Sequence, residues 1–220
     1  MMPILIDLKI RERCPRLILN TLECQVSFSH ENEQLWLYIE KSLIEVRRVL
    51  KLDDISKIPA IQKAREAYKM LGKDPSRYRL SAEALLRRIL QGKGLYRVNN
   101  VIDILNIISV KSGISIGGYD IDRIQGKVVL STADQKEEYY AVGRGLLNIC
   151  NMPVLRDSIG SFGNPTSDSE RTCVTYKTKK FLMVFFNFEG SGCANAWLNE
   201  SKNLLIQYAK ANEFTETLPV

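Results

Sequence analysis

Apolar residues recur every three or four positions in several stretches of the chain, and this spacing predicts amphipathic helices. The expected helices cover residues 31–50, 59–72, 82–91, 99–112 and 193–212. Pro59 suits the first turn of the second helix, and Gly72 suits its end. Ser81 suits the N-cap position of the third helix, with Glu83 in its first turn. The last helix would leave a frayed tail at residues 213–220.

Other stretches alternate apolar and polar residues or concentrate apolar ones, the two patterns of strands. The expected strands cover residues 4–10, 17–28, 127–133, 137–143 and 176–190, with the third and fourth paired as a hairpin. Residues 115–126 and 154–174 indicate loops, and the second is rich enough in Gly, Ser, Asp and Pro to be a functional loop. This irregular alternation predicts an α/β protein of mixed α+β type, in which helices flank a mixed sheet.

The helix expected at residues 99–112 is apolar on nearly every side, which predicts that it is buried. Its polar residues nevertheless fall on one stripe, because they are three or four positions apart: Asn99, Asp103, Asn106 and Ser109. Buried polar groups need partners. The stripe therefore either forms a hydrogen-bond network with neighbouring loops or forms one wall of a pocket.

Two further segments offer candidate pocket residues. Gly117 and Gly118 allow either a tight turn or the close approach of a ligand to the main chain. The long loop concentrates hydrogen-bonding groups and one guanidinium at Asp168, Glu170, Arg171 and Thr172. The alternative for this loop is a solvated surface segment.

The composition is that of an ordinary globular chain, with 45% hydrophobic and 25% charged residues in 220 positions, which suits a single domain over residues 1–220. No apolar run reaches the length of a membrane span, and the N-terminal residues have the wrong order for a secretory signal. Five scattered cysteines predict reduced thiols in a cytoplasmic protein, and the single histidine, His30, is expected to be structural. We expect no metal, no nucleotide cofactor and no membrane association.

The net charge is +6 and the pI is near 9.0, which suits a polyanionic partner such as RNA without requiring one. Basic residues near the expected pocket are Lys73, Arg77, Arg79, Arg87 and Arg88. They form either a solvated face or a track for RNA.

The middle of the chain carries a specific order of motifs. LLRRIL is followed by N-x-V-x-D-x-x-N in the buried helix, then by G-Y-D and by D-R-I-x-G before a strand. This order resembles the editing, tRNA-binding module of the bacterial phenylalanyl-tRNA synthetase beta subunit, and more closely the stand-alone proteins made of that module alone. The resemblance covers about residues 60–215, an editing-domain-like core. Residues 1–60 form an N-terminal strand-strand-helix part that lies outside this resemblance.

The resemblance implies an editing fold, which in the synthetase hydrolyses the ester of tyrosine wrongly attached to the phenylalanine tRNA. Asp103 and Asn106 match the aspartate and asparagine of the family's helix motif. Leu105 stands where the synthetases often have threonine, and Gly117 stands where they usually have histidine. Without that histidine, water would be activated by the substrate itself or by a carboxylate, for which the candidates are Asp168, Glu170 and Glu189.

The resemblance thus implies a stand-alone deacylase that hydrolyses mischarged aminoacyl-tRNA in trans, and the alternative is a catalytically inactive module that binds RNA or an amino-acid-like ligand. A purely structural interaction protein is the third interpretation. The expected catalytic residues are Asn106, Glu170 and Asp168. The expected substrate-binding residues are Asn99, Asp103, Ser109, Gly117, Gly118, Arg171 and Thr172. The expected RNA-binding residues are Arg77, Arg79, Arg87 and Arg88, and the expected partner is the aminoacylated 3′ end of a tRNA.

Overall fold

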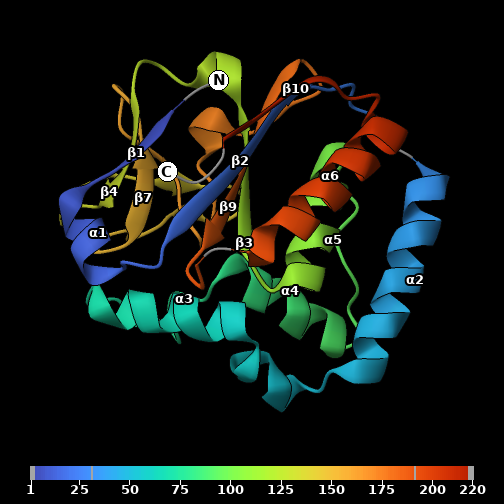
Figure 1. Cartoon of the computed structure of the whole chain (residues 1–220), viewed down its shortest axis with the longest axis horizontal. Coiled ribbons are helices and arrows are strands. Elements are labelled where there is room, and N and C mark those ends of the chain that lie inside the picture. The colour runs from blue at the N-terminus through green and yellow to red at the C-terminus, as the bar shows by residue number, and fades with distance from the viewer. Residues whose placement is uncertain (1–2, 31, 191, 218–220) are drawn as a thin grey trace.

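The computed structural model describes residues 3–30, 32–190 and 192–217, which form two four-stranded sheets flanked by helices (Figure 1). The first sheet has the order β10-β2-β9-β3 and is antiparallel throughout. Its strands are β2 (Ile18–Gln25), β3 (Ser115–Asp120), β9 (Lys180–Asn187) and β10 (Asn212–Thr217). Strand β9 is the core of this sheet, because residues 181–186 are buried on both faces.

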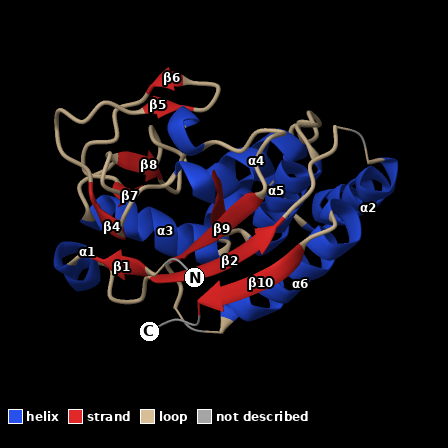
Figure 2. Cartoon of the chain, turned by 90° about the horizontal axis from the view of Figure 1, so that it is seen from above, coloured by secondary structure: helices blue, strands red, loops and turns tan. Residues whose placement is uncertain are grey.

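The second sheet has the order β1-β4-β7-β8 and is mixed, since β1 runs parallel to β4 and the other pairs are antiparallel. Its strands are β1 (Ile4–Ile6), β4 (Val128–Thr132), β7 (Pro153–Arg156) and β8 (Ser161–Gly163). A separate hairpin joins β5 (Tyr140–Ala141) to β6 (Gly145–Leu146), at the margin of the molecule in Figure 2. The predicted mixed α+β fold, with a mixed sheet and flanking helices, is confirmed.

Six α-helices lie in the described part of the chain: α1 (Leu8–Arg13), α2 (Glu33–Val49), α3 (Pro59–Met70), α4 (Ser81–Leu90), α5 (Asn100–Ser112) and α6 (Cys193–Ala209). Helix α5 is the central one, since it packs against α2, α4, α6 and β3. The Asn99 side chain caps it by accepting from Ile102 N at 2.9 Å, and Gly113 ends it in the left-handed conformation with φ 70°. The helix predicted at residues 99–112 is therefore confirmed.

The structure corrects the predicted chain path near the N-terminus and at one helix start. The strand expected at residues 4–10 stops at Ile6, because the Asp7 carboxylate accepts from Lys9 N and begins α1. Ser81 is not an N-cap residue: Leu80 holds that position, and the main-chain N–H of Ser81 donates to Pro165 O at 2.8 Å.

The pairing of several segments also differs from the prediction. Residues 115–120 form strand β3 rather than a loop, and the long segment 154–174 contains β8 and all of β7 except Pro153. The expected hairpin partner of β4 is wrong, because β4 pairs with β1 and β7 while β5 pairs with β6. The tail after α6 is not frayed over its described residues, since β10 pairs with the edge of β2. Residues 218–220 of that predicted tail lie outside the described residues.

Candidate functional site

Three of the four residues on the polar stripe of α5 are held by hydrogen bonds within the protein. Asn99 caps the helix, and the Ser109 hydroxyl donates to Ile114 O at 2.7 Å. The Asp103 carboxylate accepts from Trp36 Nε1 and Val98 N, both at 2.9 Å. Burial raises the pKa of Asp103, and these hydrogen bonds offset the rise only in part. The network interpretation thus describes these three residues.

Asn106 is the stripe residue that faces open space. It lies in the wall of a cavity of about 430 Å³, which we call the Asn106 cavity. The lining residues come from α4, the loops before and after it, α5 and the β5–β6 hairpin: Arg79, Ser81, Ala84, Leu85, Arg87, Arg88, Gln91, Lys93, Tyr96, Asn106 and Arg144. Five of them are basic and none is acidic. The cavity therefore presents an amide surrounded by positive charge.

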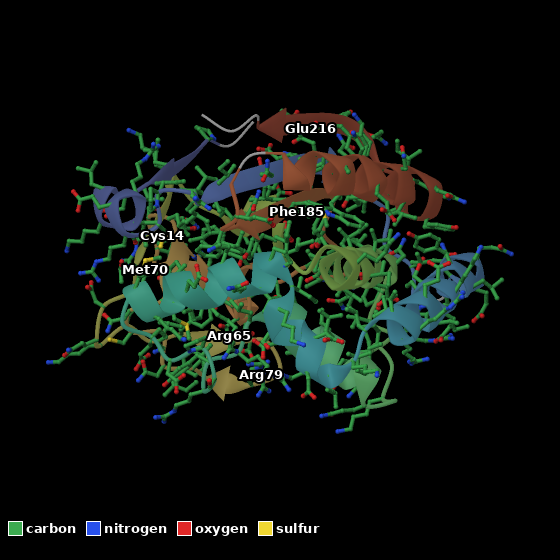
Figure 3. All side chains as sticks on the ribbon, turned by 60° about the horizontal axis from the view of Figure 1, so that its bottom comes forward. Cys14, Arg65, Met70, Arg79, Phe185 and Glu216 are labelled. Carbon is green, nitrogen blue, oxygen red and sulfur yellow. The ribbon has the colours of Figure 1, made fainter. Side chains whose placement is uncertain are left out.

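A buried carboxylate organises several of these arginines. Glu83, on the first turn of α4, is 1% exposed and lies 2.8 Å from Arg65 Nη1. The same carboxylate lies 3.1 Å from Arg87 Nε and 3.6 Å from Arg79 Nε. Figure 3 shows Arg65 and Arg79 on the same side of the molecule. One negative charge thus faces three positive ones, and the contacts from Arg79 and Arg87 are made by their Nε groups.

Arg88 and Tyr96 contact each other in the wall of the Asn106 cavity. The Arg88 guanidinium lies 3.7 Å from the centre of the Tyr96 ring, a cation–π distance. Its Nη1 donates to the Tyr96 hydroxyl at 3.0 Å, and its Nη2 donates to Lys93 O at 3.3 Å. The loop between α4 and α5 is therefore folded back onto Arg88.

The space beside Gly117 and Gly118 is occupied by the protein's own side chains and is not open to a ligand. A Cβ on Gly117 would lie 2.0 Å from the Tyr119 hydroxyl and 2.9 Å from Asp168 Oδ1. A Cβ on Gly118 would lie 2.7 Å from Leu105 Cδ1. Gly117 is therefore required because Tyr119 folds back over its own strand, and Gly118 because Leu105 packs against it.

Asp168 is held by this strand. Its carboxylate accepts from the Tyr119 hydroxyl at 2.7 Å and from Gly118 N at 3.1 Å. Burial raises the pKa of Asp168 to about 7, even though both hydrogen bonds favour its ionised form. It is the expected catalytic carboxylate whose pKa lies where a general base works at neutral pH. Its carboxylate is not among the groups that line the Asn106 cavity.

Arg171 lies in a different cavity, which we call the loop cavity. This cavity has a volume of about 830 Å³ and is lined mainly by residues 134–140, 156–161 and 169–171. Arg171 makes a two-pronged contact with the buried Asp157, at 2.9 and 3.1 Å, and also donates to Gly160 O. Its neighbour Thr172 is buried, whereas Glu170 is exposed at the cavity wall. Arg171 therefore stabilises the loop between β7 and β8, which carries Asp157 and Gly160.

The β5–β6 hairpin stands between the two cavities. Tyr140 lines the loop cavity, and Arg144, at the tip, lines the Asn106 cavity. The hairpin is fastened to the loop that carries Asp168, because Val142 N donates to Asp168 O at 2.9 Å. The main chain at Asp168 is thus hydrogen-bonded to the hairpin that contributes residues to both cavities.

The structure separates the expected RNA-binding residues. Arg79, Arg87 and Arg88 line the Asn106 cavity, whereas Arg77 lies near the Tyr78 ring and is not part of that lining. The buried Lys73 donates to the carbonyls of Asn148 and Cys150 and serves the local fold.

Sequence reasoning missed Lys93, Tyr96 and Arg144 as cavity residues. The glycines on either side of Arg144 were a signal for an exposed hairpin tip, but nothing in the sequence tells which cavity that tip approaches.

Residues 3–30, 32–190 and 192–217 contain no group of three His, Cys, Asp or Glu side chains arranged to hold a metal ion. No helix within these ranges combines the length and the apolar character needed to cross a bilayer. His30 contacts the Tyr176 hydroxyl through its Nδ1 at 2.5 Å. Cys14, Cys24, Cys150 and Cys173 are free thiols.

Comparison with known proteins gives three findings. The model of the B3/4 domain matches residues 63–201. The phenylalanine–tRNA ligase beta subunit of Tropheryma whipplei (strain Twist) is 36% identical over 104 residues, which are 46% of this chain and 11% of that protein. This chain therefore spans about a tenth of the length of that curated relative. The domain model and this relative confirm the resemblance seen in the motifs.

Among solved structures, an N-terminal fragment of the phenylalanyl-tRNA synthetase beta subunit from Pyrococcus horikoshii is similar to this chain. The match has a TM-score of 0.49 and 14% sequence identity, and it covers 99% of this chain and 54% of that one.

Proposed function

This chain belongs to the B3/4 domain family, and from that premise we propose that it recognises the aminoacylated 3′ end of a tRNA in the Asn106 cavity. The observation that carries the proposal is the lining of this cavity, in which five basic side chains surround Asn106 and no acidic one takes part. A tRNA end brings closely spaced phosphates, so it gains most from such a lining. The similar synthetase subunit supports tRNA as the RNA.

The arrangement of charge under the cavity supports phosphate binding. Glu83 contacts Arg79 and Arg87 through their Nε groups, and among the described residues the Nη groups of both arginines make no hydrogen bond, so they can donate to a phosphate. Arg144 has no side-chain partner among the described residues, and it reaches the cavity from the hairpin tip. Asn106 presents an amide that both donates and accepts, which suits a sugar hydroxyl or the aminoacyl group. A cytoplasmic location belongs to this proposal.

Ester hydrolysis of a mischarged aminoacyl-tRNA in trans is the second candidate function, and Asp168 is the observation that favours it. Its raised pKa, about 7, suits proton transfer at neutral pH. Against this, the lining of the Asn106 cavity, over the described residues, includes no carboxylate, histidine or thiol to activate water. Recognition of the tRNA end is therefore the function that the geometry supports best.

Binding to aminoacylated tRNA tests the first proposal. We expect Asn106→Ala and Arg144→Ala each to weaken binding, by about three- to tenfold, because each removes one cavity contact. Lys136→Ala is the matched control, since this exposed lysine lines the loop cavity instead. Equal affinities for wild type, Arg144→Ala and Lys136→Ala would refute the Asn106 cavity as the binding site.

A panel of mischarged tRNAs, including tyrosyl-tRNA for phenylalanine, tests hydrolysis. If Asp168 is the base, the deacylation rate rises with pH through about 7, and Asp168→Asn abolishes that rise. Deacylation at the background rate for the whole panel would sink the hydrolytic candidate. That result would leave recognition of the tRNA end intact, provided that binding is measured in parallel.

A further inference from the structure

Tyr96 is a large aromatic residue that the fold leaves exposed. Its side chain lies in the loop between α4 and α5, lines the Asn106 cavity and is 58% exposed. Aromatic side chains that stand open beside basic groups are the usual platforms for unpaired bases of single-stranded RNA. The hydrophobic clusters formed by the described residues do not include Tyr96, so packing does not account for it.

Arg88 prepares this ring in two ways. Its guanidinium covers one face at 3.7 Å from the ring centre, while its Nη1 occupies the hydroxyl at 3.0 Å. The Nη2 donor to Lys93 O ties the same guanidinium to the loop main chain. The ring is therefore held at its hydroxyl and on one face. The opposite face has no contact with Arg88 and is the one left for a ligand. A ring held in place loses little conformational freedom when a base stacks on it.

We propose that the open face of Tyr96 stacks on an unpaired nucleobase at the 3′ end of the bound RNA, an inference that rests on the proposed function. The phosphates of that strand would lie among the basic side chains nearby. Among the described residues, the side chains of Lys93 and Arg144 make no ion pair, so these two cations remain for the phosphates. A nucleobase fits this position better than an aromatic aminoacyl side chain, because Tyr96 is exposed to solvent. Because only an unpaired base can stack on Tyr96, this contact would select the single-stranded 3′ end of the RNA.

Binding of uncharged tRNA tests the stacking contact. The probes are a tRNA with its complete single-stranded 3′ end and the same tRNA without its last three nucleotides. Tyr96→Leu should weaken binding of the complete tRNA by about tenfold, the effect of losing one stacked base. Tyr96→Phe keeps the ring and should bind within about twofold of wild type. For the shortened tRNA, wild type and Tyr96→Leu should bind alike.

Tyr140→Leu is the matched control, because Tyr140 is 52% exposed but lines the loop cavity. A second readout uses 2-aminopurine as the terminal base, whose fluorescence should be quenched on binding to wild type and Tyr96→Phe but not to Tyr96→Leu. Unchanged affinity and quenching in Tyr96→Leu would overturn the stacking contact. A weakening in Tyr96→Leu that appears only with aminoacylated tRNA would assign the ring to the amino acid and also overturn it.

The two proposals fail in different ways. If wild type binds the complete tRNA and Arg144→Ala weakens it while Tyr96→Leu does not, only the stacking contact is wrong. If wild type binds neither tRNA, recognition of the tRNA end is wrong as well. Thermal melting of each variant shows whether the fold is kept, which we expect because Tyr96 is exposed in a loop.

Discussion

The two cavities on either side of the β5–β6 hairpin use arginine in opposite ways. In the loop cavity each arginine faces its own carboxylate: Arg171 faces Asp157, and Arg156 faces Glu137 at 2.8 Å. At the Asn106 cavity Glu83 serves several arginines at once, and Arg144 has no carboxylate partner in the part of the chain that the structure describes. An arginine that pairs with its own carboxylate serves the fold. Arginines that outnumber the carboxylates near them keep N–H donors for a ligand.

Asp157 and Asp168 repeat the same contrast for carboxylates. Burial alone would raise the pKa of Asp157, but hydrogen bonds from Gln125 N and from Arg171 hold the pKa below its ordinary value. Within the described ranges no cation pairs with Asp168, so burial raises its pKa to about 7. A charged neighbour therefore decides which buried carboxyl group can exchange a proton near neutral pH.

The largest effect is expected from breaking the Arg171–Asp157 pair of the loop cavity. Arg171→Ala leaves the Asp157 carboxylate, which is 0% exposed, without its counter-charge. We expect the free energy of unfolding to fall by about 3–5 kcal/mol, the usual cost of an unpaired buried charge. Urea denaturation measures it.

Arg144→Ala is the control for that destabilisation, because it removes the same side chain from the excess set. We expect a change within about 0.5 kcal/mol. Equal destabilisation by the two substitutions would show that the distinction between matched and excess arginines is wrong.

The next effect compares two positions on the stripe of α5. Asp103→Ala strands the Trp36 Nε1 and Val98 N donors, so we expect the free energy of unfolding to fall by about 2–3 kcal/mol. Asn106→Ala removes no side-chain hydrogen bond found among the described residues and should cost under about 0.5 kcal/mol. A similar cost at both positions would mean that Asn106 is also a structural residue.

An effect that depends on pH comes from the raised pKa of Asp168. Since the folded-state pKa of about 7 lies above the ordinary value near 3.9, the protonated group stabilises the fold at low pH. That contribution is lost as the pH rises from about 4 through about 7, and a rise of about three pKa units corresponds to up to about 4 kcal/mol. The difference in free energy of unfolding between wild type and Asp168→Asn, measured from pH 4 to pH 8, isolates it. A difference that does not vary with pH would contradict the assignment.

The smallest effect concerns the salt dependence of RNA binding. Lys93→Ala combined with Arg144→Ala should reduce the slope of log affinity against log salt by about 1.4, because each single-strand phosphate that is no longer neutralised accounts for about 0.7. Lys136→Ala, from the loop cavity, should leave the slope unchanged. A smaller slope in Lys136→Ala alone would place the RNA on the other side of the hairpin.

Sequence patterns predicted the elements whose signal is local. The apolar spacing of α2, α3 and α5 and the apolar run of β9 each lie within one element, so those elements were found. Strand β3 was missed because its two glycines favour a turn in isolation, whereas in the fold they make room for Tyr119 and Leu105. The partners of β4 were missed because strand pairing is set by packing between distant segments.

The candidate site was predictable only in part, for the same reason. Helical spacing placed Asn99, Asp103, Asn106 and Ser109 on one stripe, but it could not tell that three of them are satisfied by neighbouring segments. Arg171 was expected to bind substrate, and its pairing with Asp157 depends on two loops meeting in space. The substrate and RNA contacts of the individual residues stay predictions.

The position of β9 has a consequence for how the protein is made. Residues 180–187 pair with residues 18–25 on one side, and β10 then covers the outer edge of that early strand. During synthesis β2 leaves the ribosome long before β9 exists, so the first sheet closes only after β9 and β10 have been translated. A fragment limited to residues 63–201 would lack both β2 and β10 and leave one edge of an apolar strand unpaired. Such an edge promotes aggregation, so the segment that defines the family needs its flanking strands to stay in solution.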